Sequence, residues 1–97
     1  MTDLDRVIHE PGRLLIVALL SSVKEADFLY LLKQSGLTKG NLSSHIAKLE
    51  EAGYVEVEKS YKGKIPLTVL RLTQIGRDAF AFYKETMGQL LSVTPAS

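Results

Sequence analysis

The chain has 97 residues, 45% of them hydrophobic and 24% charged, which is typical of one soluble globular domain. It has no cysteine, which excludes disulfides and thiolate metal sites, and no apolar run is long enough for a membrane span. We therefore expect a single domain over residues 1–97 with no membrane association, located in the cytoplasm.

The net charge of +1 conceals an uneven distribution along the chain. Residues 1–30 contain three basic and five acidic residues, whereas residues 33–71 contain seven basic and four acidic ones. Residues 59–71 contain four basic residues and no acid. A local excess of positive charge of this kind favours a polyanionic partner.

The first part of the chain predicts an arm followed by two helices. Proline is favourable in the first turn of a helix and unfavourable in its interior, so the main helix is expected from Pro11 to about Leu20, after an arm or short helix over residues 1–10. A second helix is expected from about Lys24 to Ser35, because apolar residues recur at helical spacing and a glycine follows.

The segment after Gly36 predicts a third helix, over about residues 39–52. Thr38 is suited to cap its start, and Leu42, Ile46 and Leu49 recur at spacings of four and three residues. Only residues 36–38 separate this helix from the second one. A three-residue link that contains glycine is typical of a helix-turn-helix.

After Gly53 the hydrophobic period changes from about 3.6 to 2, which indicates strands. Two strands are expected on either side of a basic, flexible loop over residues 60–66, and together they form a hairpin. Thr73 is expected to cap a long final helix over residues 73–91.

This order of elements predicts an α+β, mainly α fold: a winged helix-turn-helix with a two-stranded β-hairpin wing and a long C-terminal dimerisation helix. The sequence "GLTKGNLSSHIAKLEEAGYVEVEKSYKGKIPLTVLRLTQIGRDAF" (36–80) also resembles the small winged-helix transcriptional regulators of the MarR/ArsR type. The resembling motifs are Leu-Ser-x-His-Ile at 42–46, "LEEAGYV", "KGKIP" and "RLTQIGRDAF", and the resemblance extends over about residues 9–85. It implies a homodimeric regulator, often a repressor, that binds double-stranded DNA.

The third helix has a second face, opposite its apolar stripe, made of small and uncharged or basic side chains. In a helix-turn-helix this helix enters the major groove, where small polar side chains permit close approach and bond base edges. The lysines of the hairpin tip suit the flanking backbone or the adjacent minor groove. The predicted DNA-binding residues are Thr38, Lys39, Gly40, Asn41, Ser43, Ser44, Ala47, Lys48, Lys59, Tyr61, Lys62, Gly63 and Lys64.

The final helix carries more apolar residues than a small winged-helix core can cover. We therefore expect a two-fold dimer that buries them, with two recognition helices about 34 Å apart on a pseudo-palindromic operator. The alternative is that the helix folds back on its own protomer. The predicted interface residues are Val7, Ile8, Ile75, Ala79, Phe82, Tyr83, Met87, Leu90 and Leu91.

No cofactor, metal site or catalytic residue is predicted. The two histidines, His9 and His45, suit packing, and no nucleophile stands beside a base, so an enzyme is not expected. A small-molecule effector is not identified by the sequence. One alternative function stays open, a winged-helix module that binds another protein, because the net charge is near zero.

Overall fold

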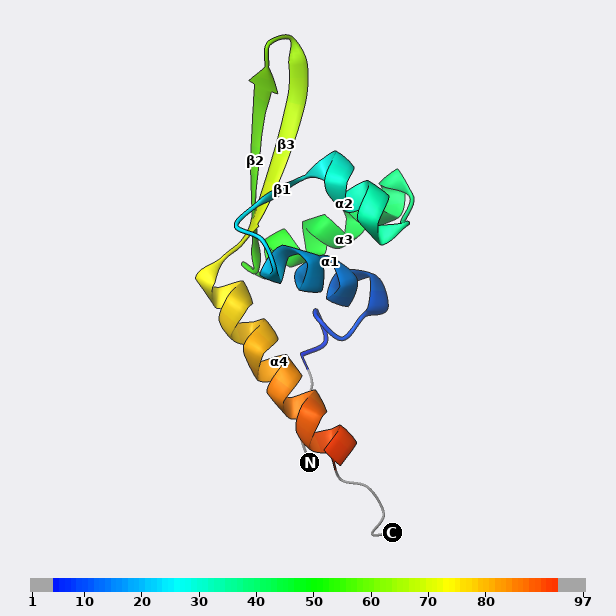
Figure 1. The fold of residues 1–97 in the computed structure, drawn as a ribbon, viewed down its shortest axis with the longest axis vertical. Coiled ribbons are helices and arrows are strands. Elements are labelled where there is room, and N and C mark those ends of the chain that lie inside the picture. Colours follow the sequence, from blue (N-terminus) through cyan, green and yellow to red (C-terminus); the bar gives the residue numbers. More distant parts are fainter. Residues whose placement is uncertain (1–4, 93–97) are drawn as a thin grey trace.

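The computed structural model describes residues 5–92, which form four helices and a three-stranded sheet (Figure 1). In chain order the elements are α1 (Pro11–Ser21), β1 (Ala26–Asp27), α2 (Phe28–Ser35), α3 (Lys39–Glu51), β2 (Val55–Lys62), β3 (Ile65–Leu72) and α4 (Gln74–Ser92). This is the predicted mainly helical winged-helix fold, with one more strand than expected. The predicted arm over residues 1–10 lies partly outside the described residues.

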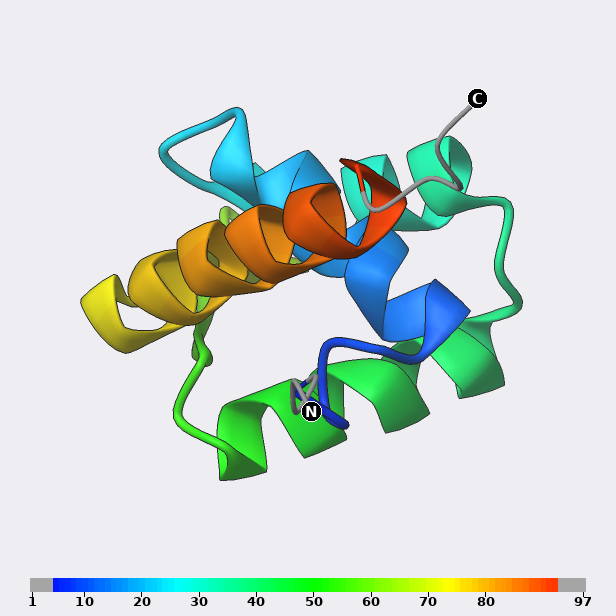
Figure 2. The same cartoon turned by 90° about the horizontal axis from the view of Figure 1, so that it is seen from below.

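Helix α1 is the centre of the helical layer, and it contacts α2, α3, α4 and β3 (Figure 2). It begins where predicted, with Pro11 in its first turn, because the Glu10 carboxylate accepts a hydrogen bond of 3.0 Å from the backbone N of Arg13. This hydrogen bond lowers the pKa of Glu10. The core-facing residues of α1 are Ile16, Val17 and Leu20.

The prediction that the second helix starts near Lys24 is wrong. Residues 26–27 instead form β1, which pairs antiparallel with β3 through Ala26 opposite Leu70 and Asp27 opposite Val69. The helix starts only at Phe28 because the Asp27 side chain caps it, accepting a hydrogen bond of 2.7 Å from a backbone N–H in the first turn. The sheet therefore has three strands, in the order β1-β3-β2.

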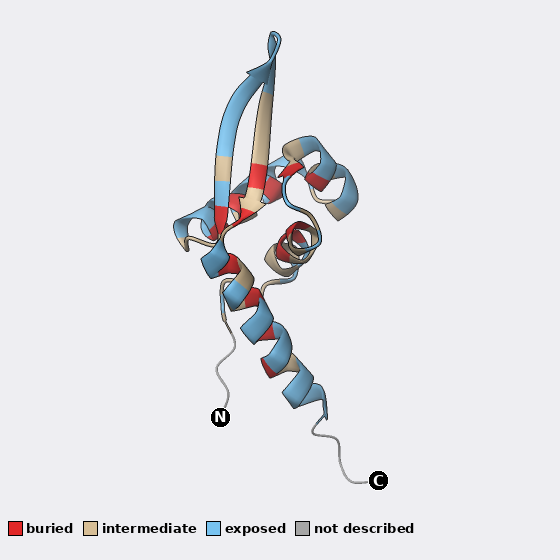
Figure 3. Cartoon of the chain, turned by 60° about the vertical axis from the view of Figure 1, so that its left-hand side comes forward, coloured by how far each residue is buried: buried red, intermediate tan, exposed pale blue. Residues whose placement is uncertain are grey.

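Strands β2 and β3 form the wing, a hairpin that projects away from the helices (Figure 1). The ladder runs from Val55 opposite Leu72 to Lys62 opposite Ile65, so the predicted loop over residues 60–66 shortens to a tight turn at residues 63–64. The base of the wing is buried against the helices, while its outer half is exposed (Figure 3). The two strands of the wing are thus paired up to its tip.

Helix α4 starts at a joint held by Thr73. As predicted, Thr73 caps the helix, and its Oγ1 accepts a hydrogen bond of 3.0 Å from the backbone N of Gly76. The same Oγ1 donates to the Gly53 carbonyl at 2.6 Å, and the Thr73 N donates to the Tyr54 carbonyl at 2.9 Å. A Cβ at Gly76 would lie 2.2 Å from the Tyr54 carbonyl oxygen, so only glycine permits this close approach.

One side of α4 packs on the protomer's own core, as the buried residues along it show (Figure 3). Phe80 and Tyr83 are buried there, and the Tyr83 hydroxyl lies 2.7 Å from His9 Nδ1 in the N-terminal segment. Ile8 in that segment is fully buried. The segment before α1 is therefore part of the protomer core and connects it to α4.

Candidate nucleic-acid interface

The turn between α2 and α3 has the predicted helix-turn-helix geometry. Gly36 ends α2 in the left-handed region, with φ of 70°, and its N–H donates to the Leu32 carbonyl at 3.2 Å. Thr38 then caps α3, because its Oγ1 accepts a hydrogen bond of 3.1 Å from the backbone N of Asn41. The link between the two helices is thus only three residues long.

Helix α3 presents two distinct faces. Leu42, Ile46 and Leu49 are buried in the core, as their spacing predicted. The opposite face is not covered by any part of the chain that the structure describes. Its exposed residues include all those predicted to contact DNA, namely Lys39, Gly40, Asn41, Ser43, Ser44, Ala47 and Lys48, preceded by exposed Thr38. Glu51, in the last turn, is exposed on the same face.

From Gly40 to Ala47 the centre of this exposed face consists of the smallest side chains, and the acidic Glu51 follows them in the last turn. At 100° per residue, Gly40, Ser44 and Ala47 fall along its midline. A Cβ built at Gly40 meets no atom within 4 Å, so the chain's own packing does not require glycine there. The larger side chains lie on the two flanks, Lys39 and Ser43 on one and Asn41 and Lys48 on the other.

A hollow of about 320 Å³ lies between α3 and the wing. It is lined by residues of both elements that were predicted to contact DNA, Ser43 and Ala47 of α3 and Lys59 of β2. Phe28, at the start of α2, also lines this hollow and was missed by sequence reasoning, because a single apolar residue in a helix carries no signal for a binding site. The complete lining is Phe28, Ser43, Ile46, Ala47, Lys59 and Thr68.

The other predicted wing residues lie at the far end of the hairpin. Tyr61 has 72% of its surface exposed, and Lys62, Gly63 and Lys64 are exposed at the tip. The register pairs Tyr61 with Pro66, near the end of the ladder, so these residues do not touch α3. They are placed to reach beyond the area that α3 covers.

The acidic residues of the wing lie on the sheet face that points away from α3. Successive side chains of a strand alternate between the two faces, and Lys59 lines the hollow beside α3, so Glu58 and Glu56 point the other way. There they bind Arg71, which donates to Glu56 at 2.9 Å and Glu58 at 2.5 Å, and also to Glu25 at 3.1 Å. The hydrogen bond that Arg71 donates to Glu58 is the main cause that raises the pKa of Arg71. On the side of α3 the strand therefore presents Lys59 without a neighbouring acidic residue.

His45 supports α3 from the inner side. Its Nε2 lies 3.7 Å from a Glu10 carboxylate oxygen, and its Nδ1 lies 3.4 Å from the guanidinium of Arg13. Both partners belong to the start of α1. The structure thus places His45 in the packing role expected from the sequence.

The predicted dimer residues fall into three groups by exposure. Ile75, Phe82, Leu90 and Leu91 are exposed, with between 44% and 71% of their surface accessible. In contrast, Ile8 and Tyr83 are 0% and 5% exposed within their own protomer, which leaves almost no surface for a partner. Sequence periodicity identified the exposed and the buried residues alike as apolar, but it did not show which of them belong to the protomer core and which to an interface. The partly buried remainder are Val7, Ala79 and Met87.

Across residues 5–92, no helix is both long and apolar enough to cross a membrane. Over the same residues, no group of three or more His, Asp or Glu side chains is arranged to hold a metal ion.

Comparison with known proteins identifies the family. The winged helix DNA-binding domain family matches residues 13–91. The chain is also 40% identical over 79 residues to Uncharacterized protein MJ0432 of Methanocaldococcus jannaschii, and this match covers 80% of the chain and 85% of the relative.

Two solved structures of regulators share the fold. The transcriptional regulator homologue from Pyrococcus horikoshii superposes with a TM-score of 0.86 at 30% identity, covering 91% of this chain and 87% of that one. The transcriptional repressor BigR from Xylella fastidiosa superposes with a TM-score of 0.66 at 26% identity, covering 94% and 84%. These neighbours confirm the predicted resemblance to regulators of the MarR/ArsR type. The chain belongs to the winged helix DNA-binding domain family, whose solved relatives include transcriptional regulators.

Proposed function

We propose that the protein is a homodimeric regulator of transcription, acting as a repressor, that binds a specific double-stranded DNA site. Helix α3 lies in the major groove, and the wing over residues 59–66 contacts the flanking backbone or the adjacent minor groove. Asn41 and the serines of α3 bond base edges, while Thr38 and the lysines bond phosphates.

The single observation that carries this proposal is the uncovered face of α3. From Gly40 to Ala47 its midline holds only small side chains, so a base-pair edge can approach this part of the helix closely. Lys39 provides positive charge in the first turn, which contains no acidic residue. The first turn also presents backbone N–H groups, and these favour a phosphate. A protein partner would not require this combination.

Dimerisation through α4 is proposed from its exposed apolar residues. Ile75 and Phe82 are seven residues apart, two helical turns, and have 63% and 62% of their surface exposed. Near the end of the helix, Leu90 and Leu91 are exposed as well. A second copy that packs on this side removes apolar surface from water on both protomers. The proposed interface is Val7, Ile75, Ala79, Phe82, Met87, Leu90 and Leu91, without the buried Ile8 and Tyr83.

The salt dependence of DNA binding tests the proposal. Each phosphate neutralised by a lysine contributes about 0.9 to the slope of log affinity against log salt, so Lys62→Ala with Lys64→Ala should reduce that slope by about 1.8. The matched control removes two exposed lysines elsewhere, Lys24→Ala with Lys84→Ala, and should leave the slope unchanged. Equal slopes for the wing variant and the wild type would remove the wing from the interface.

Sequence preference is tested separately. Asn41→Ala or Ser44→Ala should relax the preference at one base pair by about 1–3 kcal/mol, measured by competition between duplexes that differ at that position. A uniform loss over all duplexes would show that these side chains only position the protein. A protein-interaction module, the alternative function, should bind random duplex DNA weakly and with little salt dependence.

A further inference from the structure

The outer face of the sheet, which points away from α3, carries a row of apolar side chains that the proposed contact with DNA does not use. On β3, Leu67 and Val69 point to this face, because Thr68 between them lines the hollow beside α3. Both are only partly buried. At the end of the row, Ile65 has 70% of its surface exposed. An apolar row of this kind on an exposed sheet face is available to a partner.

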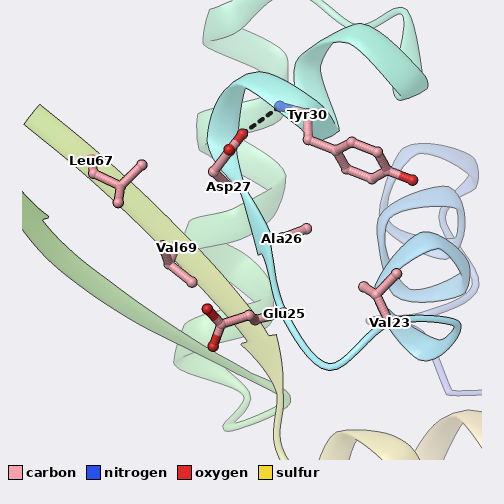
Figure 4. Close-up of a pocket in the computed structure, with 7 residues that line it drawn as sticks. All are labelled: Val23, Glu25, Ala26, Asp27, Tyr30, Leu67 and Val69. Carbon is pink, nitrogen blue, oxygen red and sulfur yellow. Dashed lines mark hydrogen bonds between the residues drawn. The ribbon is translucent and has the colours of Figure 1, made fainter. Parts of the chain in front are cut away.

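This row forms the floor of two adjoining hollows of about 430 Å³ and 270 Å³, which share Asp27 and Leu67. We call them together the lateral groove. Figure 4 shows the larger one, with side chains of β1 and β3 beside Val23 and Tyr30. The smaller one continues along β3 to Leu29, which is 69% exposed. Volumes of about 300–1,000 Å³ are usual for small-molecule sites.

The border of the larger hollow is acidic, whereas Lys62 lines the far end of the smaller one. Three glutamates share the single guanidinium of Arg71, so their cluster keeps two negative charges. Asp27 adds a third. Its Oδ1 accepts the hydrogen bond that caps α2, whereas no hydrogen bond within residues 5–92 uses its Oδ2. An anion would be repelled at the larger hollow, and a cation there would find both an acceptor and an opposite charge.

We propose that the lateral groove binds an organic cation, an amine with an apolar body. The ammonium group lies beside Asp27 and Glu25, and the apolar part packs on Leu67 and Val69 with the ring of Tyr30 beside it. The proposal rests on the shape and charge of this face, and it does not depend on DNA binding. An occupant touches both α2, a helix of the helix-turn-helix, and β3, a strand of the wing.

A pair of probes with the same ring and opposite charge tests the charge requirement. Titration of the ¹⁵N-labelled protein, without DNA, uses 1-naphthylmethylamine as the cation and 1-naphthylacetate as the anion. The amine should shift the amide signals of residues 26–30 and 67–69, and the carboxylate should bind at least ten-fold more weakly. Equal binding of both probes, no binding of the amine, or shifts confined to other residues would overturn the proposal.

Variants locate the site. Asp27→Asn keeps a side-chain oxygen that can cap α2 and removes the charge, so it should weaken amine binding about five-fold, as for a partly exposed ion pair. The control Glu85→Gln removes one exposed acidic charge from α4 and should have no effect. Val69→Lys places a positive charge in the groove without entering the core, and it should abolish binding. Amine binding that is unchanged in Asp27→Asn or Val69→Lys, with a native circular dichroism spectrum, would contradict the proposal.

Discussion

Replacing Gly40 by alanine separates the folding of α3 from its proposed contact with DNA. The added Cβ meets no atom of the chain within 4 Å, and Gly40 is not among the glycines with positive φ. Alanine is better than glycine by about 1 kcal/mol in a helix interior, and we expect half of this, about 0.5 kcal/mol, in the first turn. Gly40→Ala should therefore stabilise the free protein slightly.

The same methyl group should weaken DNA binding, because Gly40 lies on the midline of the exposed face of α3. If a base-pair edge packs there, a new methyl group overpacks the contact, which costs about 1–3 kcal/mol. The Kd for the specific duplex should then rise about 5- to 150-fold. Stability and affinity would change in opposite directions.

Gly88 provides a matched control in α4. It is exposed, and a Cβ there also meets nothing within 4 Å. Gly88→Ala should stabilise the protein by about 1 kcal/mol and leave the Kd unchanged. Urea unfolding measures stability, and fluorescence anisotropy with a labelled duplex measures the Kd. If Gly40→Ala stabilises the protein and binds DNA as tightly as Gly88→Ala does, the backbone of α3 does not approach the duplex at Gly40, and the reasoning is refuted.

Four further predictions concern stability and assembly. Gly76→Ala should destabilise the protein by about 3 kcal/mol in urea unfolding, because the new Cβ collides with a backbone carbonyl. Unchanged stability would mean that the backbone around Thr73 moves to make room for the methyl group. Burial, together with the hydrogen bond to Asp5, raises the pKa of Tyr54 to about 12. The wild type should therefore have a larger free energy of unfolding than Tyr54→Phe below pH 10, and this difference should disappear as the pH rises through 12. A difference that does not change with pH would contradict this. Glu10→Ala removes the cap of α1 and should lower the free energy of unfolding by about 1 kcal/mol near neutral pH. Because the pKa of Glu10 is lowered from 4.5, this difference should shrink as the pH falls below 4.5. Phe82→Glu should give a monomer by mass with an unchanged circular dichroism spectrum, and a persistent dimer would place the interface elsewhere.

The sequence predicts α3 and its turn well because their signals are local. The cap at Thr38, the stop at Gly36 and the spacing of Leu42 and Ile46 all act within one or two helical turns. The exposed face follows from the same spacing. Its composition identified a candidate interface, and the structure leaves that face uncovered.

The features that sequence reasoning missed depend on contacts between distant segments. Strand β1 has only two residues, and its pairing with β3 is set by the tertiary fold, which overrides the helical pattern before Phe28. Tyr83 and Phe82 are adjacent apolar residues of one helix, yet only Phe82 remains exposed, because the N-terminal segment covers its neighbour. Periodicity shows which residues are apolar, but it does not show whether another segment of the same protomer or a second protomer covers them.

The joint at Thr73 has a consequence for the operator. Only this one residue separates β3 from α4, and its hydrogen bonds to Gly53 and Tyr54 fix the direction of α4 relative to α3. In the proposed dimer, the two recognition helices would then have a fixed helical phase. With about 10–10.5 base pairs per turn, one inserted base pair rotates a half-site by about 35° and moves it by about 3.4 Å. A protein without a hinge at this point should therefore tolerate only one spacer length between the two halves of its site.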